Sequence, residues 1–470
     1  MKNLRISLLL VAFALILSFA HVIWIYTTGP VAHEDAKAGV LTLDEALIKE
    51  NKMIDLNGEW AFYPNELLTP QEVAKREPKA MIDVPESWQV NQTNQEAARG
   101  FGTYHLRIPA KALEGEILGL RVNKINLAYN LYVNGDLIQQ LGKVSSLESD
   151  AVAERRPVEV NFASTEPNID LVIQVSNYTY DTVGGIVNSL LFGTDEAIQH
   201  YFFYNKLFQI MLGLILFMYA ISSILAGMIG IAQKQSYFFS LILIFMLISI
   251  LVDDDYLILN IIDLSYEGLT RLSDFIYSGM TWLVMLLIVN HLTIKDKARL
   301  LIRTCLSILG FILLLQVFLP VNFIRDYIVL YYIPWVITSG LILSQLMKQA
   351  RYTKRVNVIL ITISLISIMT SSIWGGIKNA FALNILYYPF DILLAASVYG
   401  AYLTYRVWDV YQQNEQMENA LLQAQIQPHF IFNTLNSIIS LSYIDQERMV
   451  KLIRNFSTYL RFSFKEIKLN

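Results

Sequence analysis

The sequence of 470 residues has one cysteine and few charged residues. Cys305 has no second cysteine to pair with, which excludes an intramolecular disulfide and a cysteine-rich metal site. Charged residues make up 16% of the chain, whereas soluble proteins carry about a quarter. The net charge of −4 comes from 36 basic and 40 acidic residues without a basic block, so no footprint for nucleic acid is visible. An ordinary soluble enzyme and a nucleic-acid-binding protein are therefore both poor interpretations.

Apolar residues, in contrast, make up 54% of the sequence and gather in eight long runs. The first extends from Arg5 to about Thr27, and the others lie near 206–231, 236–252, 273–292, 300–319, 327–347, 356–376 and 385–407. Each run is long enough to cross a bilayer as a helix. The sequence therefore predicts an α-helical membrane region with eight spans, seven of them in a domain at 205–408.

The first apolar run has the basic flank of a signal sequence, supplied by Lys2 and Arg5. It is longer than the usual apolar core of a cleaved signal peptide, so we interpret residues 1–28 as an uncleaved signal anchor. Ser18, Ala20 and Gly29 are small residues of the kind found at cleavage sites, which leaves a cleaved signal peptide open. Both alternatives export the segment that follows.

The distribution of Lys and Arg predicts the orientation, because short cytoplasmic loops are enriched in these residues. With the amino terminus inside, twelve of them lie on the cytoplasmic side and four on the opposite side, leaving out the long exported segment. We therefore expect a multi-pass protein of a bacterial cell membrane, in contact with lipid, with both termini in the cytoplasm.

Acidic residues occur at two kinds of place in this region. One group lies in the predicted outer loops, where it forms solvated charge or a cation site: Asp253, Asp254, Asp255, Asp263, Glu267, Asp274 and Asp326. Asp391 instead follows Pro389 near the outer end of the last span, where an ionisable group is costly unless it faces a partner or water. We interpret Asp391 as a candidate intramembrane polar site, with Lys378 or Arg271 as its counter-ion.

The segment 29–200 has a different texture, with short alternating strands broken by Gly, Pro and Asn. Asn134 and Gly135 separate two apolar strands, and this pair favours a tight hairpin turn with positive φ. The pattern predicts an all-β sandwich.

Four motifs of this segment resemble the galactose-binding-like jelly rolls of glycoside hydrolase accessory domains: Leu56–Phe62, Val84–Trp88, Gly102–Tyr104 and Tyr129–Gly135. Modules of this kind precede the helices of seven-transmembrane receptors with diverse intracellular signalling modules, a bacterial family whose architecture the chain also resembles. The resemblance implies a sensing ectodomain for a carbohydrate or another small ligand. Trp60, Trp88 and Tyr104 are candidates for stacking on a sugar, although such aromatic residues usually fill the core. No pair of carboxylates is spaced as acid and nucleophile, which argues against hydrolysis.

A short heptad seam follows the last span and predicts a signalling coiled coil over 409–428. It consists of Val407, Val410, Asn414, Met417, Leu421 and Ala424. Asn414 lies at an a position, where a buried amide favours a parallel two-stranded pair. We therefore expect a homodimer, while a single amphipathic helix on the membrane remains an alternative.

His429 is the most reactive side chain of the cytoplasmic end. Its imidazole titrates near neutral pH, and Asn433 and Asn436 follow at helical spacing, so all three side chains share one face. This arrangement suits phosphorylation on nitrogen, but a structural histidine is the favoured interpretation of the residues alone.

Residues Gln425–Asn436 closely resemble the phosphoacceptor motif of LytS-type sensor histidine kinases, and 452–462, with Tyr459–Arg461, resembles the second helix of their dimerisation hairpin. The resemblance implies that His429 accepts the γ-phosphoryl group of ATP and passes it to an aspartate of a response regulator. Asn433 would lie beside the phosphoryl group. Residues 429–470 would then be an incomplete kinase.

The ATP-binding lobe of those kinases is not evident, since no glycine follows Gly400. Without a glycine-rich loop or an acidic metal site, these residues should not bind the ATP and Mg²⁺ that the resemblance implies. We therefore expect a fragment or truncated product of a sensor histidine kinase, inactive by itself, while a lobe supplied by another polypeptide remains an alternative. The alternative is a non-enzymatic receptor whose cytoplasmic hairpin dimerises or docks a partner. Transport is poorly supported because no internal repeat is present.

Overall fold

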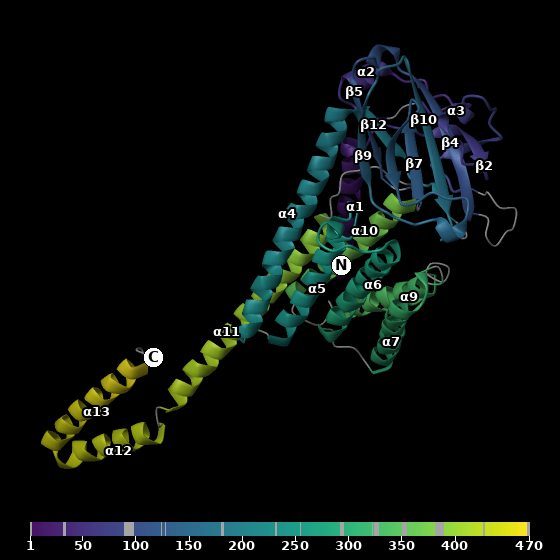
Figure 1. Ribbon diagram of the computed structural model, residues 1–470. Coiled ribbons are helices and arrows are strands. Elements are labelled where there is room, and N and C mark those ends of the chain that lie inside the picture. The colour runs from purple at the N-terminus through teal and green to yellow at the C-terminus, as the bar shows by residue number, and fades with distance from the viewer. Residues whose placement is uncertain are drawn as a thin grey trace. The chain divides into compact units, whose positions relative to one another are not determined.

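The computed structural model describes the chain apart from residues 1, 32–33, 89–97, 124, 127, 180–182, 231–232, 254, 292–295, 322, 324–328, 350–354, 381–389, 426–427 and 468–470. The chain divides into two compact units, Met1–Gly400 and Ala401–Asn470. The first unit contains a β domain and most of the helices (Figure 1).

The β domain consists of antiparallel sheets between helices α1 (Lys2–Thr28) and α4 (Asp195–Met228). The six-stranded sheet comprises, in spatial order, β3 (Ala80–Val84), β2 (Gly58–Pro64), β4 (Gly100–Pro109), β10 (Asn168–Asn177), β7 (Ala128–Val133) and β8 (Asp136–Leu141). The four-stranded sheet comprises β1 (Ile54–Asp55), β12 (Leu190–Thr194), β5 (Ile117–Val122) and β9 (Val158–Ala163). Strand β11 (Gly185–Ile186) pairs with β6 (Ile125–Asn126), and α2 (Glu45–Lys49) and α3 (Pro70–Val73) are short.

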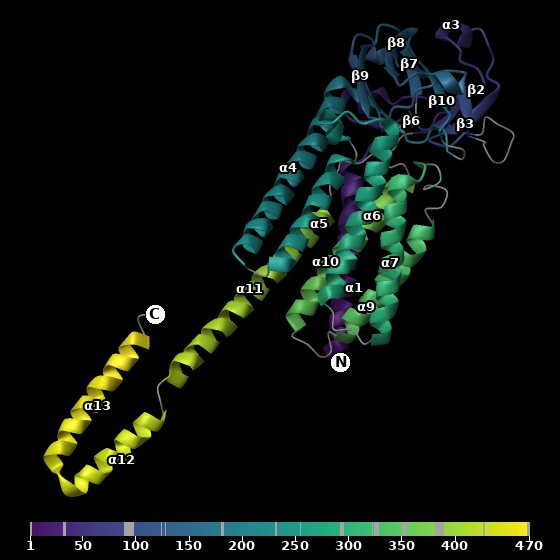
Figure 2. The ribbon, with the colours of Figure 1, turned by 60° about the horizontal axis from the view of Figure 1, so that its bottom comes forward.

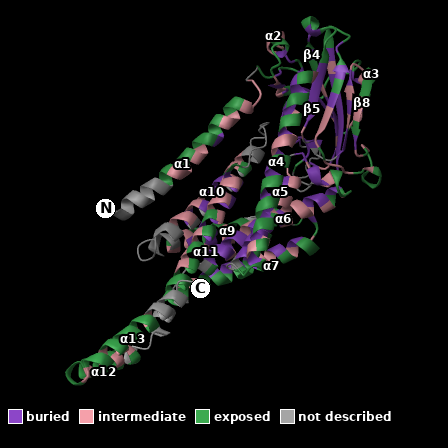
Figure 3. Ribbon diagram, turned by 90° about the vertical axis from the view of Figure 1, so that its left-hand side faces the viewer, coloured by how far each residue is buried: buried purple, intermediate pink, exposed green. Residues whose placement is uncertain are grey.

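One apolar core joins the two larger sheets. Leu106 of β4 and Leu171 of β10 belong to the same buried cluster as Leu118 and Leu120 of β5, and Figure 3 shows these strands largely buried. Between Tyr104 and Pro109, β4 alternates buried residues with more exposed ones, which is the pattern of a half-buried strand. Strands β5 and β10 are buried along nearly their whole length. The predicted all-β domain is confirmed.

The predicted hairpin turn is also present. Asn134 and Gly135 have φ values of 48° and 95° and connect β7 to β8, with Val133 paired to Asp136. Two central residues with positive φ form the turn that matches the twist of antiparallel strands. A glycine and an asparagine tolerate this backbone at little cost.

A helix lies at each of the eight apolar runs of the sequence. After α1 and α4 these are α5 (Gln233–Leu251), α6 (Tyr266–His291), α7 (Asp296–Phe318), α9 (Val329–Gln349), α10 (Arg355–Ala380) and α11 (Phe390–Gln425). Helix α1 packs on α10, and α6, α7 and α9 lie side by side (Figure 2). Among the described residues, four helices are long and apolar enough to cross a membrane: Val11–Thr28, Asp195–Met228, Tyr266–Asn290 and Lys297–Phe318. The count of eight spans and their orientation therefore remain predictions.

The second unit begins within α11 and continues with α12 (Pro428–Ile444) and α13 (Gln446–Ile467), which pack against each other. Helix α11 runs without a break from Phe390 to Gln425. The described part of the predicted last span and the predicted heptad seam are consequently parts of one helix. The predicted domain boundary at 408 marks a change of composition, but the backbone stays helical there.

Candidate functional site

The segment around His429 forms the start of α12. Pro428 is the first residue of this helix, a position that suits proline because the first N–H groups of a helix have no intrahelical acceptor. His429 follows it, and its side chain lies outside the residues whose burial is described. Asn433 and Asn436 come one and two turns later, and both are exposed. The helix therefore gives the three polar residues the shared face that the spacing predicts.

Phe430 holds the beginning of α12 on α13. Its ring lies with centroids 4.9 Å from Tyr459 and 6.3 Å from Phe456, within the range of favourable aromatic pairs. Because Phe430 is the next residue after His429, this contact fixes the backbone that carries the histidine. Tyr459 lies in the segment whose sequence resembles the second hairpin helix.

Asp445 forms the turn between α12 and α13. Its N–H donates to the carbonyl of Leu441 at 2.8 Å, and its carboxylate Oδ1 accepts from the N–H of Arg448 at 3.0 Å. The second bond caps the amino end of α13, where backbone donors otherwise lack acceptors. A connection of one residue makes the two helices neighbours.

Helices α12 and α13 carry exposed apolar side chains among the described residues, and we call these residues the hairpin face. It consists of exposed side chains that are spaced along both helices: Phe432, Leu435, Ile439, Tyr443, Ile444, Val450 and Ile453. Val410 and Met417 of the predicted seam are exposed as well. Many exposed apolar side chains along a pair of helices are typical of a protein interface.

The described residues contain no group of three His, Cys, Asp or Glu side chains that would hold a metal ion. Glycine, the residue of phosphate-binding loops, is absent after Gly400. The described part of residues 401–470 therefore does not fit ATP with Mg²⁺.

Asp391 has a partner that the sequence did not indicate. Its Oδ2 lies 2.6 Å from Nε2 of His21 in α1, and both side chains are buried. The His21 ring stacks on Trp374 of α10 at 5.2 Å between centroids. Arg271, one of the two expected counter-ions, bonds instead to Glu267 and to the carbonyl of Val317, so this expectation was wrong. The side chain of Lys378 lies outside the described residues.

The three aromatic residues considered for sugar stacking lie in the core of the β domain. Trp60, Trp88 and Tyr104 each have 0% exposure. The rings of Trp88 and Tyr104 stack at 5.8 Å with an angle of 7° between their planes, and the indole N–H of Trp88 donates to the carbonyl of Ala98 at 2.8 Å. Burial also raises the pKa of Tyr104. In this structure the three side chains present no face to a ligand.

A polar cluster between the β domain and the helices was missed. Arg121 of β5 is 2% exposed, and its guanidinium donates to Asp255 at 2.7 Å. Asp255 was expected to be solvated loop charge or part of a cation site, but its side chain has 0% exposure, so solvated charge is wrong for this residue. An arginine between Leu120 and Val122 in an apolar strand was the available signal.

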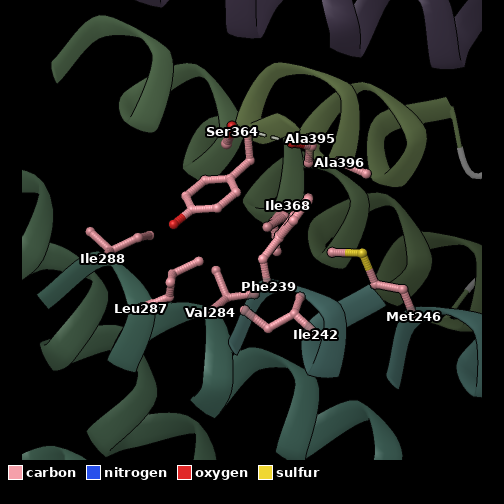
Figure 4. A pocket seen from close by; sticks show the side chains of 11 residues that line it. Phe239, Ile242, Met246, Val284, Leu287, Ile288, Ser364, Ile368, Ala395 and Ala396 are labelled. Carbon is pink, nitrogen blue, oxygen red and sulfur yellow. Dashed lines mark hydrogen bonds between the residues drawn. The ribbon is translucent and has the colours of Figure 1, made fainter. Parts of the chain in front are cut away.

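A small pocket lies among the helices of the first unit (Figure 4). Its lining comes from α5, α6, α10 and α11 and is apolar except for Ser364 and Tyr399. Ser364 donates to the carbonyl of Ala395 at 3.3 Å. With no Asp, Glu, His, Cys, Lys or Arg side chain in its lining, the pocket is poorly suited to acid–base or metal chemistry.

Comparison with known proteins gives a family match in the second unit. Residues 417–470 match the family model described as histidine kinase. A stretch of 52 residues is 50% identical to the uncharacterized protein YwpD of Bacillus subtilis (strain 168), which is 11% of this chain and 19% of YwpD. The chain thus matches less than a fifth of the length of this relative.

Solved structures that are similar to this chain include a calcium-binding mutant of β-glucuronidase 2 from Bacteroides uniformis. The identity is 16% and the TM-score is 0.23, and the match covers 30% of this chain and 17% of that one. A GH2 β-galacturonidase from Eisenbergiella tayi has 18% identity, a TM-score of 0.22 and coverage of 30% and 24%. A β-glucuronidase from Ruminococcus gnavus has 16% identity, a TM-score of 0.22 and coverage of 30% and 29%.

The family match covers the helix that begins with Pro428 and His429 and the helix that packs on it. It supports a histidine kinase signalling function for this chain, and the apolar helices are consistent with a location in a membrane.

Proposed function

We propose that this chain is the sensing and phosphoacceptor part of a dimeric membrane sensor histidine kinase. The observation that carries the proposal is the match of residues 417–470 to the histidine kinase family, together with the place of His429 at the start of α12. In this proposal the β domain lies outside the cell and α11 to α13 lie in the cytoplasm, as the distribution of Lys and Arg predicts.

The chemical step is phosphoryl transfer to the imidazole of His429. A lone pair on a ring nitrogen attacks the γ-phosphorus of ATP, the new N–P bond forms, and the bond to the β–γ bridging oxygen breaks to release ADP. A carboxylate of a response regulator then takes the phosphoryl group and leaves the imidazole free. Phe430 positions the histidine through its contact with Tyr459, and Asn433 lies on the same helical face.

ATP with Mg²⁺ is the phosphoryl donor in this proposal, and it must be held by a nucleotide-binding lobe that the described residues do not form. We derive no nucleotide-binding role for any residue of this chain. The hairpin face and the exposed seam residues of α11 are proposed to pair with a second copy, because apolar surface of this extent gains free energy when it is covered.

The β domain is proposed to be the sensor, for a carbohydrate or another small ligand. Its jelly-roll character and its place in the architecture of seven-transmembrane receptors with diverse intracellular signalling modules rest on the sequence motifs. Because Trp60, Trp88 and Tyr104 are fully buried, the ligand must contact other side chains.

The experiment uses the complete gene product in lipid nanodiscs with radiolabelled ATP and Mg²⁺. We expect labelling that is stable in base and labile in acid, as a phosphohistidine is. His429→Gln should abolish it, while His200→Gln, which removes an exposed histidine of α4, should leave it unchanged. Equal labelling of His429→Gln and the unaltered protein would overturn the proposal, and no labelling of the unaltered protein would favour a receptor without kinase activity.

A further inference from the structure

Three elements of the first unit meet at the carboxylate of Asp255, which lies between α5 and the short helix Leu257–Asn260. One oxygen accepts from the guanidinium of Arg121 in β5 at 2.7 Å. The other accepts from the side-chain amide of Asn205 in α4, also at 2.7 Å. Arg121 is therefore the residue through which the β domain holds a helix-connecting turn.

The surroundings of Arg121 exclude water from this contact. Its guanidinium lies 5.3 Å from the ring centre of Tyr201 and 4.9 Å from that of Phe202, both in α4. Cation–π contacts of this kind strengthen when they are desolvated. A buried ion pair loses much of its stability if one partner is removed, because the other charge stays buried. The link between Arg121 and Asp255 is thus sensitive to any group that competes for either charge.

Glu159 is such a group. It lies on β9 directly opposite Arg121 in the β5–β9 register, and its Oε1 is 3.7 Å from Nη1 of Arg121. The side chain is 22% exposed, and Oε1 accepts no hydrogen bond from any residue that the structure describes. At 3.7 Å the two groups attract each other but are too far apart for a good hydrogen bond.

We propose that Glu159 is a proton-binding site that controls this link, so that the protonated carboxyl leaves Arg121 on Asp255 and the ionised carboxylate draws Arg121 away. The ligand of the site is the proton, exchanged with water on the side of the membrane where the β domain lies. The mechanism goes beyond the kinase function and does not depend on it.

The charges that face Glu159 come from three places. Arg121 and Lys206 favour its ionised form, whereas Asp255 and Asp195 oppose it. Desolvation by burial is the largest effect and raises the pKa of Glu159 to about 8. Lys206 is itself held over the ring of Phe202, with Nζ 3.6 Å from the ring centre. Helix α4 therefore supplies both a cation, Lys206, and an anion, Asp195, near Glu159.

The sign of the pH dependence follows from this shift. We call the arrangement in which Arg121 is bonded to Asp255 the closed junction. In it Glu159 binds the proton more tightly than a carboxyl in water does, so acid favours the closed junction. The preference is fully present below the ordinary pKa of glutamate and is lost as the pH rises through about 8. Above that pH the Glu159 carboxylate must be solvated by water or paired with the guanidinium of Arg121. Either change weakens the bond between Arg121 and Asp255.

The test measures the distance between the β domain and the turn that carries Asp255 in the full chain in nanodiscs. Cysteines replace two exposed residues, Leu137 of β8 and Ile261, in a Cys305→Ser background, and spin labels report the distance by pulsed electron resonance at pH 6.5 and 9.5. We expect one narrow distribution at pH 6.5 and a broader distribution with longer distances at pH 9.5.

Glu159→Gln keeps the neutral form and should give the narrow distribution at both values of pH. Glu116→Gln, a change at an exposed carboxylate of the same domain, should respond as the unaltered protein does. Asp255→Asn should give the broad distribution at both values of pH, and if it fails to fold, Glu159→Gln alone decides. A pH response that survives in Glu159→Gln, or its absence from the unaltered protein, would overturn the proposal.

Discussion

His21 and Asp391 are 370 positions apart, yet Nε2 of the histidine lies 2.6 Å from Oδ2 of the aspartate in a buried contact. The pair joins α1 to the start of α11, the helix that continues to Gln425. Trp24 of α1 adds a second contact, with its ring 5.1 Å from that of Phe390. The first helix is thereby an integral part of the packed helices.

Replacing Asp391 with Ala should destabilise this packing by about 1–3 kcal/mol, because the buried hydrogen bond between Asp391 and His21 is lost. Thermal unfolding in detergent measures the change, and Asp263→Ala, at an exposed position, should change the melting temperature little. In a His21→Ala background the Asp391→Ala change should cost much less, since the partner is already absent. Equal costs in both backgrounds would show that the two residues do not act as a pair.

Trp88→Ala should destabilise the β domain by about 3–5 kcal/mol, as is typical for the loss of a large aromatic side chain from a core. The variant loses the stack on Tyr104 and the bond to the carbonyl of Ala98. Denaturant unfolding followed by circular dichroism measures this, with Leu137→Ala at an exposed position as the control. Unchanged stability in Trp88→Ala would contradict a core role and reopen sugar stacking.

Gly185→Ala should cost about 1–3 kcal/mol more than Gly115→Ala, the range for overpacking a core. Both glycines have positive φ, 80° and 91°, so the backbone penalty is shared. A Cβ at Gly185 would lie 2.2 Å from the hydroxyl oxygen of Tyr104, whereas one at Gly115 meets nothing within 4 Å. The difference in unfolding free energy between the two variants therefore isolates the clash. Equal losses of unfolding free energy would show that the Tyr104 hydroxyl does not lie against Gly185.

Ile439→Asp should weaken self-association of the protein by roughly tenfold or more, because a charge on the hairpin face must be desolvated when the face is covered. Light scattering of detergent-solubilised protein over a concentration series gives the association constant. The control for the association constant is Ser440→Asp, which adds the same charge at the neighbouring exposed position, outside the hairpin face. Association that is equally strong in Ile439→Asp would show that the hairpin face is not the interface.

The sequence predicted elements whose cause is local. Asn134 and Gly135 specify their turn by backbone preference alone, and the eight apolar runs form helices because each satisfies its own backbone hydrogen bonds. His429 was found through a long motif, and the part of it from Pro428 to Asn436 lies in α12.

Contacts between distant segments were not predictable in this way. The expected counter-ion of Asp391 was Lys378 of α10 or Arg271 of α6, but its partner His21 belongs to the first helix. Arg121 and Asp255 are separated by 134 positions, and neither residue shows by itself that the other is near. Which helix lies beside which strand is a property of the packed molecule, so these pairs became visible only in the structure.

The most direct measurement of the central claim is the location of the phosphoryl group. The complete gene product is incubated with ATP and Mg²⁺, digested at neutral pH and examined by tandem mass spectrometry. The account predicts a phosphoryl group on the imidazole of His429. A phosphoryl group on another residue, with His429 unmodified, would contradict it.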